Sequence, residues 1–509
     1  MKKRNLSALI SVYSKDNLNP ILEEFKKNKI NIFSTGGTYE YIKKQGFKAT
    51  AIETLTKYPS ILNGRVKSLH PKIFGGILAI KNKKTDKEDV EKYKIPLFDF
   101  VIVDLYPFKE TIASTQDESK IIEKIDIGGI SLIRAAAKNY KHITVVSSKE
   151  DYNQFYSLLK YNKGIFSIKE KKLFATKAFK KSLYYDSCIY NYFENNKEKK
   201  HFYIDQKTEL RYGENPHQEA AIYSFFENIN LVQINGKKLS YNNYNDIFSS
   251  LAISKSLPKN KGTVIVKHTN PCGVSINKDK LKSYQYALAC DPTSAFGGVV
   301  SCNFKVNANL ATEINKLFFE VILANGFEKD ALRILKRKKN LRIIDVNKVK
   351  LVDIENILSN FNTMLIQKSD INKFTKKNFK VVSIKKPNSK TFNNLIFAFN
   401  VCRFVKSNAI VLVNKDSTVG IGGGQPSRID SCNIAINKMN KFQKPINKDE
   451  IIAASDAFFP FVDGFERLVQ AGVKAVIQPY GSINDKKIIK FANETKTILV
   501  FAKTRHFKH

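Results

Sequence analysis

The chain has 509 residues, of which 43% are hydrophobic, and its formal net charge at pH 7 is +38. A chain of this length is expected to form about two to four domains with large buried cores. It contains no run of about 18 apolar residues, which argues against a membrane span. The six cysteines are scattered without a CxxC pair, a pattern typical of reduced thiols in a cytoplasmic protein and not of a disulfide framework or a zinc site.

The positive charge has more than one interpretation. A strongly basic protein often binds nucleic acid or another polyanion. Here the lysines are spread along the whole chain, asparagine, isoleucine and phenylalanine are abundant, and tryptophan is absent. This composition fits an A/T-rich genome that enriches lysine everywhere, so nucleic-acid binding is the less favoured primary function. The same positive field would also suit phosphorylated small substrates.

The first part of the chain alternates between short apolar segments and helical patterns. The apolar segments span residues 8–12, 30–33, 100–103 and 143–146. With helical patterns such as residues 18–27 between them, they predict a parallel sheet flanked by helices. The basic start of the chain is followed by an apolar stretch that is too short for a signal peptide and favours a first buried strand.

A polar and charged segment, residues 195–200, is a candidate linker, so the chain is predicted to divide near residues 195–205. A longer mixed α/β region follows to the C-terminus, without a repeat of fixed period. The lysine- and asparagine-rich residues 335–395 are expected to form an exposed connection.

A hydroxyl- and glycine-rich turn, residues 34–38, follows the second predicted strand and precedes a helical pattern at residues 39–45. Glycines let backbone amides approach an anion, hydroxyls donate further hydrogen bonds, and a helix N-terminus adds a favourable dipole. The turn therefore predicts a phosphate cradle, which Lys15 could reach from the end of the first strand. A simple strand-to-helix turn with a Ser/Thr cap is the alternative.

A basic segment, residues 63–72, contains Arg65 and Lys67 beside a glycine and a proline. Arginine is suited to bidentate recognition of phosphate or carboxylate. A solvated basic loop is the alternative.

Ionisable side chains also follow the next strand and begin or occupy the next helix. Asp104 and Tyr106 come after the strand at residues 101–103, and Asp126 precedes a helix that carries Lys138. In a doubly wound sheet, positions of this kind converge on one crevice.

The second region contains the most informative segment, residues 264–273, Val-Ile-Val-Lys-His-Thr-Asn-Pro-Cys-Gly. The β-branched run predicts a buried strand that ends at Lys267 and His268 and is followed by a Pro/Gly turn. Adjacent cations disfavour each other's charged form, and a neutral histidine is a general base near neutral pH. A solvated lysine and a structural histidine are the alternative.

Five further segments carry polar, glycine or aromatic residues at turns, and they span residues 210–218, 239–243, 289–298, 420–428 and 455–461. The glycine run in 420–424 could hold a phosphate but is not a Walker A loop, because no Gly-Lys-Ser/Thr completes it. The aromatic run could wall a flat heteroaromatic ring. Each segment alone is equally compatible with a structural turn.

Taken together, these segments resemble the bifunctional purine-biosynthesis family that combines AICAR transformylase and IMP cyclohydrolase. The matching motifs span residues 34–38, 65–71, 105–108, 125–129 with 135–139, 211–218, 267–273, 290–298, 420–428, 455–461 and 505–509. They occur in the family's order and cover nearly the whole chain.

The resemblance implies two reactions and a division of the chain. Residues 1–195 would form an IMP cyclohydrolase domain with a methylglyoxal-synthase-like doubly wound α/β fold. Residues 201–509 would form a transformylase domain of two cytidine-deaminase-like α/β lobes. The second domain would transfer a formyl group from 10-formyltetrahydrofolate to AICAR, and the first would close formyl-AICAR to IMP with loss of water.

The resemblance also implies site residues. In formyl transfer His268 would be the base and Lys267 would stabilise developing charge, whereas in ring closure Lys138 would donate and accept the proton with help from Lys67, Tyr106 and Asp126. The expected substrate-binding residues are Lys15, Thr35, Gly36, Gly37, Thr38, Arg65, Ser68 and Asp104 in the first domain and Arg211, Tyr212, Gly297, Glu320 and Asn408 in the second. The expected folate-side residues are Arg428, Phe458, Asp463, Ser482 and Arg505.

Further expectations concern metals, assembly and departures from the family pattern. The zinc signature of the deaminases is missing, so no catalytic metal is expected. A homodimer in the cytoplasm is expected. Asp104 stands where the family often has asparagine, and Asn325 and Tyr480 also depart from it. A nucleotide-binding protein without catalysis and a nucleic-acid-associated protein are the rival functions.

Overall fold

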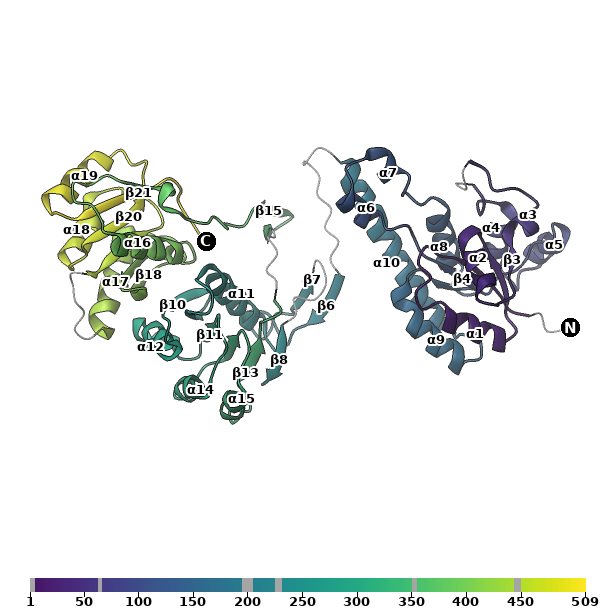
Figure 1. Cartoon of the computed structure of the whole chain (residues 1–509), viewed down its shortest axis with the longest axis horizontal. Helices are drawn as coiled ribbons and strands as arrows, with labels where there is room; N and C mark the ends of the chain where they lie inside the picture. Colours follow the sequence, from purple (N-terminus) through teal and green to yellow (C-terminus); the bar gives the residue numbers. More distant parts are fainter. Residues whose placement is uncertain (1–4, 63–65, 195–204, 225–230, 350–354, 444–449) are drawn as a thin grey trace. The chain divides into compact units, whose positions relative to one another are not determined.

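The computed structural model describes residues 5–62, 66–194, 205–224, 231–349, 355–443 and 450–509. The chain forms two compact units, Met1–Tyr203 and Ile204–His509, shown in Figure 1. In the part of the chain that the structure describes, no helix is both long and apolar enough to span a membrane.

The first unit is built on a five-stranded sheet in the order β3-β2-β1-β4-β5. Its strands are β1 (Ser7–Ser11), β2 (Asn31–Ser34), β3 (Thr50–Ala51), β4 (Phe100–Val103) and β5 (Thr144–Val146). Every pairing between neighbours is parallel. The predicted doubly wound parallel sheet is therefore confirmed.

Helices cover both faces of this sheet. They are α1 (Asn19–Lys27), α2 (Gly36–Lys44), α3 (Ile52–Thr56), α4 (Pro71–Leu78), α5 (Lys84–Lys92), α6 (Phe108–Ser114), α7 (Glu118–Ile122), α8 (Gly128–Lys138), α9 (Tyr152–Tyr161) and α10 (Ile168–Phe193). Side chains of a strand alternate between the faces, and two separate cores result. Leu9 packs in the core that contains α4 and α8 residues, whereas Ala8 and Ile10 pack in the core that contains α1 and α9 residues.

The second unit is built on a twelve-stranded sheet in the order β16-β21-β20-β19-β17-β18-β10-β9-β11-β12-β13-β8. Its strands are β8 (Val232–Asn235), β9 (Gly262–Lys267), β10 (Asn270–Ile276), β11 (Val299–Cys302), β12 (Val321–Ala324), β13 (Arg342–Asp345), β16 (Phe379–Val381), β17 (Ile410–Asn414), β18 (Ser417–Gly422), β19 (Ile452–Ser455), β20 (Ala475–Pro479) and β21 (Ile498–Ala502). Two small hairpins stand outside it, β6 (Asp205–Glu209) with β7 (Ala221–Ser224) and β14 (Asn356–Asn360) with β15 (Thr363–Gln367).

The second unit consists of two lobes with the same order of elements. Its helices are α11 (Tyr241–Ser256), α12 (Lys280–Cys290), α13 (Pro292–Ala295), α14 (Ala308–Asn315), α15 (Lys329–Leu335), α16 (Ser389–Cys402), α17 (Arg428–Phe442), α18 (Val462–Gln470) and α19 (Asp485–Glu494). In each lobe a helix (α11 or α16) is followed by a hairpin (β9–β10 or β17–β18), and a helix (α12 or α17) leads to a strand antiparallel to the hairpin (β11 or β19). Two parallel strands complete each lobe. The expectation of two α/β lobes is confirmed, although no fixed sequence period announces them.

The lobes share one continuous sheet because β10 pairs with β18 through Ser275 and Ser417. The Ser275 and Ser417 hydroxyl oxygens are 2.7 Å apart, and both are buried. Side chains of both lobes fill one shared core beside this junction.

Two local expectations need correction. Residues 271–273 were expected to form a turn but belong to β10, which carries a register shift between Pro271 and Gly273. Gly273 is required there because a Cβ would lie 1.9 Å from the Ala287 carbonyl oxygen of α12. Residues 335–395 are not one exposed connection, since they include the buried strand β13 and the start of α16.

Candidate functional site

The phosphate cradle predicted at residues 34–38 lies where β1 and β2 end, at the carboxyl edge of the first sheet. The backbone amide of Val12 donates to the Thr38 hydroxyl at 3.0 Å, and that hydroxyl donates to the Val12 carbonyl at 2.9 Å. The Thr35 hydroxyl is 2.8 Å from that of Ser11. Thr35 and Thr38 are buried, so their hydroxyls fasten the two loops together, and the exposed amides of the Gly36–Gly37 start of α2 are the groups free to face an anion.

Lys67 and Ser68 lie against the starts of two helices. A Cβ on Gly36, whose φ is +41°, would be 3.2 Å from Lys67 Nζ, and a Cβ on Gly128 would be 3.1 Å from Ser68 Oγ. The glycines at the starts of α2 and α8 therefore make room for these two side chains. A lysine at one helix N-terminus and a hydroxyl at the next are groups suited to an anion.

Two carboxyl groups occupy the same edge. Asp104 follows β4 and accepts hydrogen bonds from the backbone amides of Tyr13 and Ser14. Asp126 precedes α8 and accepts one from the Gly129 amide at 2.6 Å. Burial raises the pKa of both carboxyls; these amides oppose the rise, and the charge of Asp104 raises the pKa of Asp126 further. Both groups are thus weaker acids than ordinary carboxyls.

Cations stand next to these acids. Lys15 donates to the carbonyls of Val12 and Tyr13, each at 2.8 Å. Burial lowers the pKa of Lys15, an effect that Asp104 opposes and Lys67 reinforces. Lys67 also lowers the pKa of Asp126, so these four ionisable side chains interact with one another.

Tyr106 completes the set. Burial raises the pKa of its phenol, and Asp126 adds to that rise. Its ring meets Tyr13 edge-on with centroids 5.5 Å apart, and Lys124 Nζ lies 5.1 Å from the ring centroid. Tyr13 and Lys124 could not be predicted from the sequence, because nothing in their local pattern places them beside Tyr106.

The structure does not bring Lys138 together with this cluster. It is the exposed last residue of α8, ten residues after Gly128. At 1.5 Å per residue, it lies about 15 Å from the helix start. α8 starts at the carboxyl ends of the strands and runs back along the sheet, so Lys138 lies near the amino ends of the strands. Arg65 lies outside the described residues.

In the second unit, the predicted residues gather at one edge of the long sheet. The strands β11 and β12 of one lobe begin at the edge where β9 ends, and β19, β20 and β21 of the other lobe end beside the start of β17. Lys406 joins the two halves of this edge, since its amide donates to Asn270 Oδ1 at 2.9 Å. The residues that follow or precede these strand ends are Lys267, His268, Gly297, Glu320, Asn408, Phe458, Ser482 and Arg505.

Lys267 is held against Gly297. Its ammonium donates to the Phe296 carbonyl at 2.7 Å and would be 3.9 Å from a Cβ on Gly297, whose φ is +73°. His268 is exposed and stands in the two-residue turn that joins β9 to β10. The pair thus presents a fixed cation beside an accessible imidazole.

Glu320 lies at the same edge, immediately before β12. Its carboxylate accepts hydrogen bonds from Arg342 at 3.0 Å and from the Asn243 side chain at 3.1 Å. Arg211 and Tyr212 follow β6, where the guanidinium carbon is 5.3 Å from the tyrosine ring centroid. The loop after them is tied to α11, because the Asn242 side chain donates to the Glu214 carbonyl.

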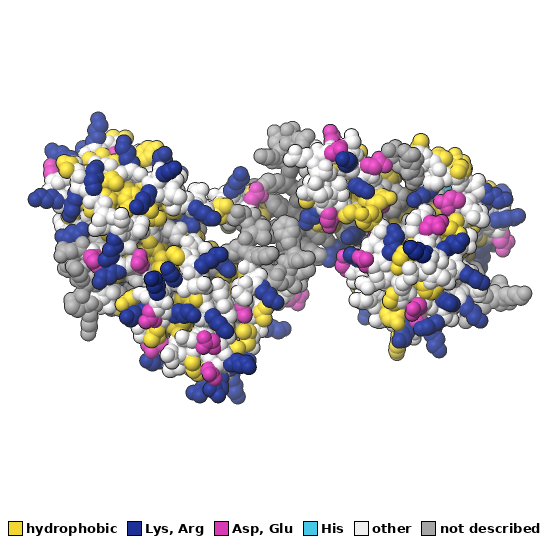
Figure 2. All heavy atoms as spheres, in the orientation of Figure 1, with side chains coloured by type: hydrophobic (Ala, Val, Ile, Leu, Met, Phe, Trp, Pro, Cys, Tyr) yellow, Lys and Arg dark blue, Asp and Glu magenta, His cyan; other side chains and the backbone are white. Residues whose placement is uncertain are grey.

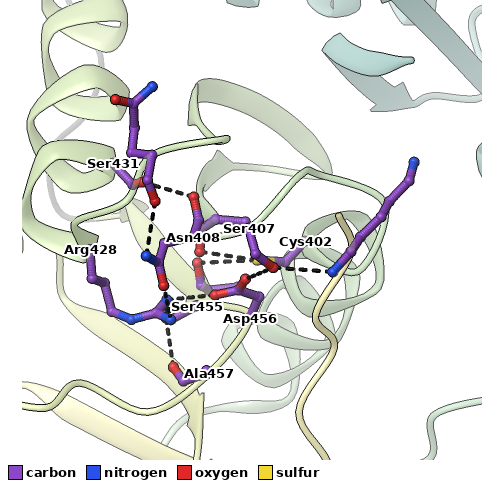
Figure 3. A network of polar contacts seen from close by, with 12 residues as sticks. Cys402, Ser407, Asn408, Arg428, Ser431, Ser455, Asp456 and Ala457 are labelled. Atoms are coloured by element: carbon purple, nitrogen blue, oxygen red, sulfur yellow. Dashed lines mark hydrogen bonds and ion pairs between the residues drawn. The ribbon is translucent and has the colours of Figure 1, made fainter. Parts of the chain in front are cut away.

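Asn408 and Arg428 belong to one buried network, drawn in Figure 3. Arg428 donates to Asp456 at 2.5 Å, to the Ser455 hydroxyl at 2.6 Å and to Asn408 Oδ1 at 2.7 Å. Asn408 in turn donates to the carbonyls of Gln425 and Pro426. The expected folate-side role of Arg428 stays a prediction. In the structure its guanidinium organises Asn408 and the end of β19.

The remaining folate-side residues lie on neighbouring loops of the second lobe. Phe458 is half-buried, Asp463 lies in the first turn of α18, and Ser482 accepts a hydrogen bond from the Asn484 amide. The loops are joined because the Asn484 side chain donates to the Pro460 carbonyl at 2.7 Å. Phe461, Tyr480 and Ile483 are exposed beside them, and Arg505 lies over the Phe507 ring. This apolar, partly charged surface suits a flat ring with an acidic tail.

Surface charge and metal ligands bear on the rival functions. Figure 2 shows Lys and Arg side chains dispersed over the visible face of each unit. Across the described ranges, no group of three or more His, Cys, Asp or Glu side chains could hold a metal ion.

Comparison with known proteins gives two family matches. The model of the "AICARFT/IMPCHase bienzyme" family matches residues 136–438, and that of the "MGS-like domain" family matches residues 17–131. Among curated relatives, a "Bifunctional purine biosynthesis protein PurH" of Bacteroides thetaiotaomicron is 42% identical over 508 residues, covering 100% of this chain and 99% of the relative. Proteins with the same description from Leptospira biflexa and Caldicellulosiruptor saccharolyticus are 39% and 40% identical, and 99% of each chain is covered.

Proposed function

The chain belongs to the AICARFT/IMPCHase bienzyme family and catalyses AICAR formyl transfer and IMP ring closure, and on this premise we propose that each reaction takes place in one of its two units. Ring closure is assigned to residues 1–195 and formyl transfer to residues 201–509. The observation that supports this division is that each unit contains its own cation beside a proton-transfer group, Lys67 with Asp126 in one and Lys267 with His268 in the other.

In ring closure, the carboxamide nitrogen of formyl-AICAR attacks the formyl carbon. A C–N bond forms and the carboxamide nitrogen loses one proton; the formamide nitrogen loses a second as the C=N bond forms, and the C–O bond breaks so that the formyl oxygen leaves with both protons as water. An amide nitrogen is a poor nucleophile, so orientation supplies much of the acceleration. Lys67, beside the start of α2, stabilises the charge on the former formyl oxygen. Asp126 and Tyr106, whose pKa values are raised by burial, exchange the protons.

In formyl transfer, we assign 10-formyltetrahydrofolate as the donor. The AICAR amine attacks the formyl carbon, His268 takes the amine proton, and the folate nitrogen leaves with a proton as tetrahydrofolate. Lys267 stands with its ammonium over the Gly297 turn, where it stabilises the negative charge that develops on the formyl oxygen.

The other predicted residues are proposed to bind and orient. In the first unit, the group that grips phosphate and ribose comprises Lys15, Thr35, Gly36, Gly37, Thr38, Arg65, Ser68 and Asp104. In the second, AICAR is held by Arg211, Tyr212, Gly297, Glu320 and Asn408. The folate is held by Phe458, Asp463, Ser482 and Arg505, and Arg428 contributes by fixing Asn408.

Lys138 remains a separate prediction as the proton carrier of ring closure. Its place at the far end of α8 favours the cluster of Lys67, Tyr106 and Asp126 for the direct steps.

We also propose that the protein works in the cytoplasm as a homodimer, without a nucleic-acid partner. All six cysteines are free thiols, which suits a reducing compartment.

The assignment is tested with conservative variants assayed separately on each reaction. Asp126→Asn and Tyr106→Phe should slow closure of supplied formyl-AICAR by about 10²- to 10⁴-fold and leave formyl transfer unchanged. His268→Gln and Lys267→Met should slow formyl transfer and leave closure of supplied formyl-AICAR unchanged. A variant in the second unit that slows ring closure as strongly as formyl transfer would contradict the division.

A further inference from the structure

The turn that carries His268 has a left-handed backbone, and the Lys415–Asp416 turn between β17 and β18 of the other lobe shares it, with φ angles of +46° and +40°. Lys267 pairs with Asn270 across the β9–β10 hairpin, so His268 and Thr269 form a two-residue loop. Their φ angles are +52° and +62°, in the left-handed region that favours glycine. Two consecutive non-glycine residues in this region persist only where the surroundings hold them, and such strain is concentrated at functional sites.

The amides of this turn are held by Asp246 of α11. The Thr269 amide donates to Asp246 Oδ1 at 2.6 Å, and the His268 amide also interacts with this carboxylate. Burial raises the pKa of Asp246, and both amides lower it. A carboxylate that accepts two consecutive amides fixes the left-handed turn from one side.

The carbonyls of the turn are held from the other side. The Asn270 side chain donates to the His268 carbonyl at 3.3 Å. Lys508, the penultimate residue, reaches the Thr269 carbonyl at 3.5 Å and the Phe404 carbonyl at 3.0 Å. The amides and carbonyls of both turn residues therefore have partners, and Asp246 and Lys508 come from elements far away in the sequence.

Lys508 is itself firmly placed. Its amide donates to the Ser407 hydroxyl at 3.1 Å, and the Ser407 amide donates to its carbonyl at 2.9 Å. Ser407 also donates to Asp456 at 2.6 Å, which connects Lys508 to the network of Figure 3. Burial, with a smaller contribution from Lys406, lowers the pKa of Lys508 to about 8. A buried ammonium is costly, and here it connects the turn of one lobe to the C-terminal segment of the other.

We propose that Asp246 and Lys508 are positioning residues for formyl transfer, which hold the His268–Thr269 turn so that the imidazole stays where it takes the amine proton. This inference rests on the proposed role of His268. Neither residue needs to touch the substrate, because both act on the backbone of the turn. Displacement of a catalytic group by about 1 Å can cost about 10²-fold in rate.

The test uses the full-length protein with Lys508→Met, Lys508→Arg and Asp246→Asn. Lys487→Met, at an exposed position on α19, is the matched control. Each variant is assayed for kcat and KM of formyl transfer and for closure of supplied formyl-AICAR. Lys508→Met and Asp246→Asn should lower kcat of formyl transfer by about 10- to 100-fold, with KM for AICAR changed less than about threefold and ring closure unchanged. Lys508→Arg, which keeps a cation that donates to carbonyls, should restore most of kcat.

The inference is overturned if both variants keep kcat within about twofold of the parent protein, or if the loss falls on KM alone. Loss of ring closure together with formyl transfer would mark a general folding defect and would also contradict it. His268→Ala separates this inference from the proposed function. If His268→Ala retains formyl transfer, the role of His268 fails; if it abolishes transfer while Lys508→Met and Asp246→Asn are unaffected, only the positioning role fails.

Discussion

The Arg428–Asp456 pair is the element of the second unit whose removal should be most damaging. The exposed fractions of the two side chains are 7% and 0%, and their closest atoms are 2.5 Å apart. The change to make is Arg428→Met, which removes the charge and keeps much of the length. Asp456 would then stay buried with Ser407 as its remaining side-chain donor.

The expected cost follows from this geometry. Breaking a buried ion pair by removing one partner costs about 3–5 kcal/mol, because an uncompensated charge stays inside. Arg428→Met also leaves Asn408 Oδ1 and the Ser455 hydroxyl without their guanidinium donor. Asp456→Asn should cost a similar amount by leaving the arginine unpaired. The double variant should recover at least about half of the loss, because neutral replacement of a buried pair is tolerated far better than breaking it.

The assay is urea unfolding of the full-length protein, followed by a probe in the second unit and fitted as a double-mutant cycle. Formyl transfer and ring closure are measured on the same samples, and ring closure should be unchanged in all three variants. Single variants that each cost less than about 1 kcal/mol, with additive effects in the double variant, would refute the reasoning, since that is the behaviour of an exposed pair.

Three further predictions concern single positions. Burial raises the pKa of Asp126 above its ordinary value of 3.8, so between the unfolded and folded pKa values the folded chain binds more protons than the unfolded chain and stability falls as pH rises. Asp126→Asn should reduce this slope in urea midpoints measured upward from about pH 4, and an unchanged slope would assign it to other groups. Lys138→Ala should slow ring closure less than about tenfold, because the side chain lies about 15 Å from the start of α8; accumulation of formyl-AICAR would instead make Lys138 a direct participant. Gly273→Ala should destabilise the second unit by about 1–3 kcal/mol, since the new Cβ would lie 1.9 Å from the Ala287 carbonyl; an unchanged thermal midpoint would show that α12 moves freely.

Much of the fold could be predicted from local patterns. The apolar segments of the first unit alternate with helices at spacings that a parallel sheet requires, and the polar residues after β1, β2 and β4 then had to meet at one edge. The position of Lys138 could also have been predicted, because the eleven residues of α8 separate its two ends by a length fixed by helix geometry.

The rest depends on contacts between distant residues. The turn at His268 and Thr269 was missed, because neither residue favours a left-handed conformation and the Pro-Cys-Gly that follows is the stronger turn signal. The residues that hold it, Asp246 and Lys508, are more than 20 residues away along the chain in one case and more than 200 in the other. The commitment of Arg428 to Asp456 is likewise a tertiary contact, and the motif around Arg428 shows only that a charge is present.

The central claim is that two separable sites perform successive reactions. In the direct measurement, each purified variant is supplied with AICAR and 10-formyltetrahydrofolate, and the formation of formyl-AICAR and of IMP is followed in the same sample. Lys67→Ala should accumulate formyl-AICAR without IMP, and His268→Ala should form neither product but convert supplied formyl-AICAR to IMP. An equimolar mixture of the two variants should restore IMP formation. Loss of both reactions in either variant, or failure of the mixture to make IMP, would contradict the account.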